Sequence, residues 1–212
     1  MNSHAVHAKS QRILILSGTG YPLRSGMVKW IEQLGAALAN AGCEVRQIVA
    51  SEMPTIGWTG CYQIQSLGDS RRRKQIGNHY LQGFRRFRMV HRIVAGMLTT
   101  GWNPNLVISD STPSMLLLAH RTALQGNVPR LVIAGGDFFR EEPRWLLRNM
   151  VRHLYKRATG IFVDGADLQA VLAKEGINQQ SLHVIPHGVD TDVLTPGVSS
   201  ELFFHFLGEK NL

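Results

Sequence analysis

Short apolar runs alternate with longer amphipathic segments along most of the chain. The apolar runs predict strands over 12–17, 44–50, 61–67, 105–110, 130–137, 160–165 and 182–186. Between them, apolar residues recur at intervals of three and four, which predicts helices over 27–41, 76–98, 113–124, 145–157 and 166–174. Ser25 or Gly26 is expected to begin the first helix, and Gly42 to end it.

This alternation is typical of βαβ units, so we predict an α/β fold: a doubly wound, Rossmann-like parallel sheet with helices on both faces. One domain over 12–196 accounts for nearly all of the pattern, with 1–11 as a disordered tail and 197–212 as a linker or the start of a truncated second domain. Such sheets bind ligands beyond the carboxyl ends of their strands, which directs attention to the loops at 18–26, 110–113, 135–139 and 164–167.

Charge narrows the class of partner. The chain has 23 Lys and Arg against 15 Asp and Glu, a net charge of +8, which favours anionic partners. The densest basic stretch, Arg71–Arg92, has no acidic residue. A sheet-covering helix with a solvated basic side is the ordinary interpretation, and attachment to an anionic membrane is the alternative. Nucleic acid is not expected as a partner, because no recognised binding motif accompanies the charge.

The chain shows no targeting or membrane-spanning segment. The opening residues have no apolar signal core, and no run of about 18 apolar residues follows. Cys43 and Cys61 each adjoin an apolar segment and are expected to be buried thiols in a reducing compartment, with a disulfide as the alternative. We therefore predict a cytoplasmic protein, with peripheral attachment to the inner face of the membrane as an extension of that prediction.

Two loops carry candidate chemistry. "SGTGYPLRSGMV" puts glycines before a helix, where backbone N–H groups and the helix dipole favour a phosphate or carboxylate, although a tight turn explains it equally well. It is neither G-x-G-x-x-G nor a Walker loop. "IAGGDFF" ends a strand in two glycines and Asp137, which can accept hydrogen bonds from sugar hydroxyls or cap a helix.

Two other strand ends are less specific. In "SDSTP", Asp110, Ser111 and Thr112 precede Pro113 and suit helix capping. "VIPHGVDTDVLTP" contains Asp190 and Asp192, but two carboxylates without further ligands hold a metal poorly, so we predict no metal site there.

Together these segments resemble the N-terminal domain of a GT-B glycosyltransferase of family four. "VIPHGVDTDVLTP" is similar to the family's V-I-P-N-G-V-D-x-x-x-F-x-P, with His187 for Asn and Leu194 for Phe. "GYPLRSGMVKWIEQLGAALANAGCEVRQI" resembles its glycine-rich loop and first helix, and "GGDFF" resembles its G-D-[YF]. "KRATGIFVDGADLQAVLAKEGI" resembles a further segment of the family, with Gly160 in place of Asp.

The resemblance implies a retaining transfer of a sugar from a nucleotide-sugar to a glycan or lipid-linked acceptor, with no separate cofactor. It places the donor phosphate at Gly20, Arg24, Ser25 and Gly26. It places Asp137 in the catalytic site, and Asp110, Ser111 and Gly136 on the acceptor side.

Nothing in the chain matches the family's second, donor-binding domain. A fragment, a truncated product and one half of a split enzyme with a second chain therefore all stay open. A non-catalytic module that binds a partner or a membrane surface is the alternative function. A nucleotide-dependent oxidoreductase shares the fold class but lacks the expected fingerprint.

Overall fold

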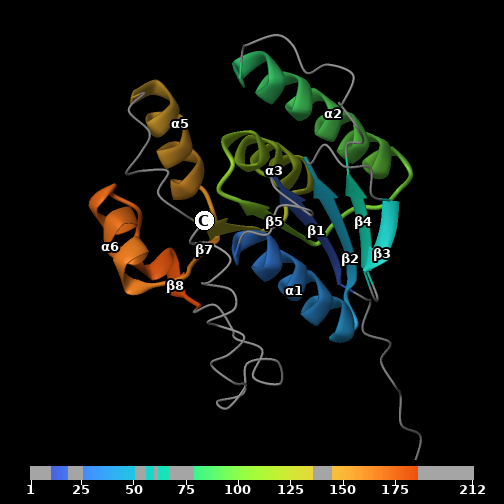
Figure 1. The fold of residues 1–212 in the computed structure, drawn as a ribbon, viewed down its shortest axis with the longest axis horizontal. Helices are drawn as coiled ribbons and strands as arrows, with labels where there is room; N and C mark the ends of the chain where they lie inside the picture. The colour runs from blue at the N-terminus through green and yellow to red at the C-terminus, as the bar shows by residue number, and fades with distance from the viewer. Residues whose placement is uncertain are drawn as a thin grey trace, which may run out of the picture.

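The computed structural model describes residues 11–18, 26–50, 56–59, 62–66, 79–135 and 145–185 (Figure 1). Eight strands form one sheet in the order β3-β4-β2-β1-β5-β6-β7-β8, and every neighbouring pair is parallel except β3 with β4. The strands are β1 Arg12–Ser17, β2 Glu44–Val49, β3 Ile56–Thr59, β4 Tyr62–Ser66, β5 Leu106–Asp110, β6 Arg130–Ala134, β7 Gly160–Val163 and β8 Leu182–Val184. The predicted Rossmann-like fold is confirmed.

The helices also lie close to their predicted bounds. They are α1 Gly26–Asn40, α2 His79–Thr99, α3 Pro113–Gly126, α5 Trp145–Lys156 and α6 Ala166–Lys174, with a 3₁₀ turn at Gln179–Ser181. As predicted, α1 starts at Gly26 and is followed by Gly42, whose φ of +88° suits a residue without a side chain.

The helices cover the sheet in two layers. In β1, Ile13 and Ile15 face α1, where they pack with Trp30 and Ile31. The alternate residues Leu14 and Leu16 face α2 and α3, whose buried side chains include Val90, Val94, Met115 and Leu118. Figure 1 shows α1 on one side of the sheet and α2 and α3 on the other. Helix α5 packs beside α3 in a third cluster that also covers β6 and β7.

Strand β3 was not predicted from the sequence. β3 pairs antiparallel with β4, with Thr59 opposite Tyr62, and extends the sheet beyond its last parallel strand. Four residues containing a glycine give too weak a periodic signal to predict a strand. β6 also ends at Ala134, before the predicted limit at residue 137.

A charge cluster joins α5 to the end of α6. Glu175 accepts hydrogen bonds from Arg148 and Arg152, and its side chain is only 10% exposed. The bond from Arg148 is the main reason that the pKa of Glu175 lies below its usual value. Because α5 and α6 flank β7, this cluster fixes the two helices relative to each other.

Two smaller observations concern the cysteines and the helix lengths. Cys43, which was expected to be a buried thiol, is free but only partly buried, and Cys61 lies outside the described residues. None of the helices in the described ranges has the length and apolar content needed to cross a bilayer.

Candidate functional site at the carboxyl edge of the sheet

The strand order reverses between β1 and β5. From β1 the chain passes to β2 on one side, whereas β5, β6 and β7 follow one another on the other side. Open α/β sheets bind ligands in the crevice beyond the carboxyl ends of the two strands at such a reversal. Here those ends are Ser17 with Gly18, and Asp110 with Ser111.

Asp110 joins the two strand ends. One carboxylate oxygen, Oδ2, accepts hydrogen bonds from the Gly18 amide at 2.6 Å and from the Ser17 hydroxyl at 3.1 Å. The other, Oδ1, accepts from the Thr112 amide at 2.9 Å. The residue is only 2% exposed, and this burial raises the pKa of Asp110 although the bonds from Thr112 and Gly18 oppose the rise. Asp110 therefore fixes where the glycine-rich loop leaves β1.

Gly18 allows the two strand ends to approach closely. A Cβ atom on Gly18 would lie 2.2 Å from Oγ1 of Thr112 and 2.6 Å from its Cβ, well inside van der Waals contact. Only a residue without a side chain fits here while its amide donates to Asp110. The first residue of the glycine-rich loop is thus required by packing.

A chain of hydroxyl groups reaches this edge from the core. Ser111 Oγ lies 3.2 Å from the Gly135 carbonyl oxygen, and the side chain of Tyr155 is hydrogen-bonded to Ser111. Because a carbonyl only accepts, Ser111 must donate its single hydrogen to Gly135, which leaves Tyr155 to donate to Ser111. Tyr155 on α5 thereby supports the carbonyl at the point where the chain leaves β6.

Tyr155 and Arg130 are two further buried polar residues, and their charges interact. Tyr155 is 2% exposed, and burial, reinforced by the nearby Asp110 charge, raises the pKa of its phenol. Arg130 is equally buried and donates through Nη2 to the Leu154 carbonyl, and burial lowers the pKa of its guanidinium to about 10. The two groups stabilise each other's charged forms. At neutral pH, Tyr155 is consequently a neutral hydrogen-bond donor.

The structure places two of the predicted site residues, the consecutive Asp110 and Ser111, at the carboxyl edge, where they bond to Gly18 and Gly135 respectively. Gly26, the first residue of α1, is the only predicted phosphate-binding residue within the described ranges. Lying outside those ranges are Gly20, Arg24, Ser25, Gly136, Asp137, Asp190 and Asp192.

The capping expectation needs a correction. Thr112 is the N-cap residue of α3, yet its side chain makes no capping hydrogen bond. The Thr112 side chain is instead hydrogen-bonded to Asp110, which also accepts the bond from the Thr112 amide. Asp110 thus stabilises the strand end and not the first turn of the helix.

Sequence reasoning missed Ser17, Tyr155 and Arg130. Ser17 was assigned only as the end of a strand, and Tyr155 occupies an apolar position of a helical pattern. A buried polar side chain at such a position is recognisable only once its partners are known. Across the described ranges, no group of three or more His, Cys, Asp or Glu side chains is arranged to hold a metal ion.

Comparison with known proteins gives a family and a fold. The profile of Glycosyltransferase Family 4 matches residues 24–193, which is most of the chain. No curated protein matches the chain significantly by sequence. Among solved structures, sucrose-phosphate synthase from Thermosynechococcus elongatus superposes with a TM-score of 0.71 at 18% identity, covering 92% of this chain and 52% of that one.

Two further structures share the fold at lower similarity. Anabaena HepE, solved in complex with UDP, has a TM-score of 0.60 at 13% identity and covers 92% of this chain and 50% of its own. UDP-GlcNAc 2-epimerase from Methanocaldococcus jannaschii has a TM-score of 0.54 at 15% identity, covering 82% of this chain and 45% of its own. The chain spans about half the length of these structures. Because an epimerase is among them, the fold alone does not define the reaction.

Proposed function

The chain belongs to Glycosyltransferase Family 4, and on that premise we propose that it takes part in transferring a sugar from a nucleotide-sugar to a glycan or lipid-linked acceptor, with retention of configuration. The observation that carries the proposal is the junction of Asp110 with Gly18 at the reversal of strand order. The glycine-rich loop begins at this junction, and open α/β sheets bind their ligands at this position.

For the donor, we assign the diphosphate to the segment between Gly18 and the first turn of α1. That segment contains Gly20, Arg24 and Ser25 and leads directly into Gly26. The first turn of α1 has no acidic residue, so its backbone N–H groups and helix dipole favour an incoming anion. Solved relatives of this fold with bound UDP support the choice of a nucleotide-sugar.

For the acceptor, we assign the carboxyl ends of β5 and β6. Ser111 bonds to the Gly135 carbonyl, and the next two residues in the chain are Gly136 and Asp137. We assign the role of catalytic carboxylate to Asp137. We assign to Gly136 the role of letting the acceptor approach the backbone closely. Asp110, buried and bonded to its neighbours, acts as a positioning residue through Gly18.

The coverage of about half of each relative supports a two-part site. We propose that these residues form the acceptor-side wall and that a further domain or second chain completes the donor site. A non-catalytic module that keeps the binding wall without turnover is the alternative, and the two differ in a transfer assay.

The assay incubates the pure 212-residue protein with radiolabelled nucleotide-sugars and a panel of glycan and lipid-linked acceptors. We expect less than one product molecule per protein molecule, because in the proposed two-part site these residues supply only one wall. Multiple turnovers would contradict the two-part site, and the anomeric configuration of their product would test retention directly. Transfer that appears only when a second chain is added would exclude the non-catalytic module.

A further inference from the structure

Four helices, α2, α3, α5 and α6, cover one face of the sheet, and the first three carry basic residues but no acidic ones, whereas α6 has Asp167 in its first turn. Neither α2, α3 nor α5 contains Asp or Glu. Over residues 79–135 the sequence has a single acid, Asp110, and it is buried. The basic residues within these helices, by contrast, are Arg85, Arg86, Arg88, Arg92, Arg121, Arg148, Arg152 and Lys156. Helix α1, on the opposite face, does contain an acid, Glu32.

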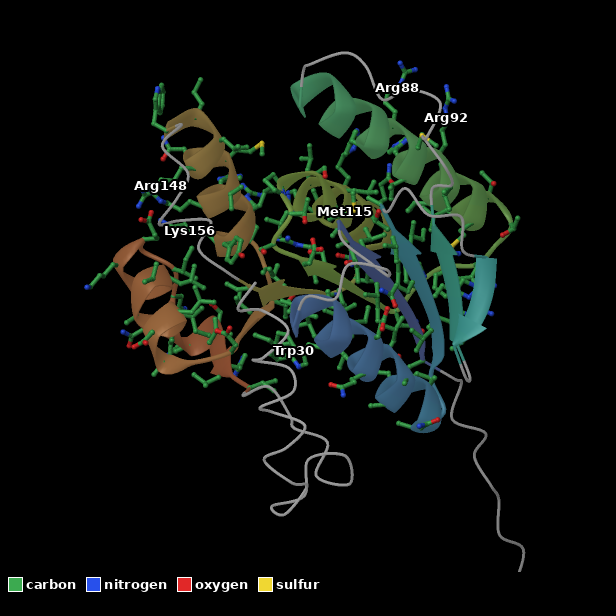
Figure 2. The ribbon with its side chains drawn as sticks, viewed as in Figure 1. Trp30, Arg88, Arg92, Met115, Arg148 and Lys156 are labelled. Carbon is green, nitrogen blue, oxygen red and sulfur yellow. The ribbon has the colours of Figure 1, made fainter. Side chains whose placement is uncertain are left out.

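Several of these charges point into solvent. Figure 2 shows Arg88 and Arg92 extending from α2 away from the sheet, and both are exposed. They lie four residues apart and therefore on one face of the helix. Arg121 on α3 is exposed too. Arg148 and Arg152 differ, because they pair with Glu175. The outward face of α2 and α3 therefore has a positive potential with no acidic residue of its own helices to balance it.

Exposed apolar side chains lie at one end of the same layer. Trp145 and Leu146, the first residues of α5, are 68% and 67% exposed, and Met89 on α2 is 44% exposed. Because α2 and α5 each follow a parallel strand, both begin at the carboxyl edge of the sheet. The apolar pair and the start of α2 thus lie toward the edge that holds the candidate site, and the Arg residues of α2 follow in the middle of that helix.

We propose that this layer docks on an anionic lipid bilayer, with Trp145 and Leu146 entering the interface and α2 resting on the headgroups. The surface combines the two features that interfacial attachment needs, uncompensated basic residues and protruding apolar side chains. Lipid is favoured over nucleic acid because Trp145 and Leu146 gain by burial among acyl chains and gain nothing from phosphates alone. Docking in this orientation brings the acceptor side of the candidate site to the membrane, which favours a lipid-linked acceptor. Only this last step rests on the proposed function.

The test is sedimentation of the 212-residue protein with phosphatidylcholine vesicles and with vesicles that also contain phosphatidylglycerol. We expect binding only to the anionic vesicles and weakening at high salt. Replacing Arg88 and Arg92 together by serine should weaken binding about thirtyfold, the effect of two basic residues near an anionic surface. The matched control is Lys174→Glu, an exposed position at the end of α6, which is not one of the three acid-free helices; it changes the net charge by the same amount and should change binding little.

The apolar pair has its own control. Replacing Trp145 and Leu146 by serine should weaken binding about tenfold or more, because both lose their burial in the interface. Leu124→Ser alters a leucine that is 63% exposed at the far end of α3 and should have no effect. Three outcomes would each overturn the proposal. They are equal binding to neutral and anionic vesicles, equal loss of binding in the variants and their controls, and binding to RNA but not to vesicles. None of these outcomes depends on transferase activity, so the proposed function stands or falls separately.

Discussion

Replacing Gly18 by alanine is expected to lower the free energy of unfolding by about 3 kcal/mol, because the new methyl group has no space. It would lie 2.6 Å from both Cβ and Cγ2 of Thr112, and rotation of the threonine cannot move Cβ. The end of β1 must therefore shift away from β5, which also lengthens the bond from the Gly18 amide to Asp110. Chemical denaturation of the purified variant measures the loss.

A double-mutant cycle separates the clash from other effects of the substitution. Thr112→Gly removes the side chain that the methyl group meets. It breaks no helix-capping bond, but it does remove the hydrogen bond from the Thr112 side chain to Asp110, so the double variant is compared with Thr112→Gly and not with the wild type. Most of the loss should be recovered in the double variant Gly18→Ala/Thr112→Gly relative to Thr112→Gly alone. Additive effects would show that Gly18 is needed for another reason.

Asp110→Ala is expected to have a comparably large effect, a loss of about 3 kcal/mol and roughly 6–12 °C in melting temperature. The substitution removes the acceptor of the hydrogen bonds from Ser17, Gly18 and Thr112, at a site shielded from water. Asp167→Ala is the matched control, since Asp167 is an exposed acid in the first turn of α6, and it should cost less than about 1 kcal/mol. Similar losses in the two variants would contradict the role of Asp110.

The same carboxyl group gives a pH dependence of known sign. Burial raises the pKa of Asp110 in the folded protein above its unfolded value of 3.8, so the folded state binds the proton more tightly. The resulting stabilisation is complete below the unfolded pKa and is lost as the pH rises through the folded pKa. The unfolding free energy of the wild type, relative to that of Asp110→Asn, should therefore grow as the pH falls from neutral towards about 4. A shrinking difference would mean that the hydrogen bonds outweigh burial.

The fold could be predicted from the sequence because its signals are local and repeated. Apolar runs and helical spacing predicted β1, β2, β5 and the five α-helices of the described ranges within a few residues, and the strand–helix alternation predicted the parallel sheet. β3 was not predicted because an edge strand of four residues depends on its pairing with β4 and not on its own periodicity.

The candidate site was only partly predictable. Asp110 and Ser111 were found because strand ends at the switch of a parallel sheet are a general location for ligands. Their partners were not, because Tyr155 and Ser111 are separated in the sequence and meet only when α5 packs beside α3. No sequence pattern predicts that Asp110 is buried and hydrogen-bonded to Gly18.

The measurement that tests the central claim most directly is an NMR titration of the isotope-labelled protein with UDP and UDP-glucose up to millimolar concentration. Backbone amides at the carboxyl edge should shift in a saturable way, namely those of residues 17–18, 26–30, 110–112 and 135. Amides at the opposite edge, such as those of Arg12, Glu44 and Arg130, should stay unchanged. Glucose alone serves as the control for weak sugar binding. Shifts centred on the opposite edge, or no saturable shift with either nucleotide, would contradict the assignment of a nucleotide-sugar site to the junction of β1 and β5.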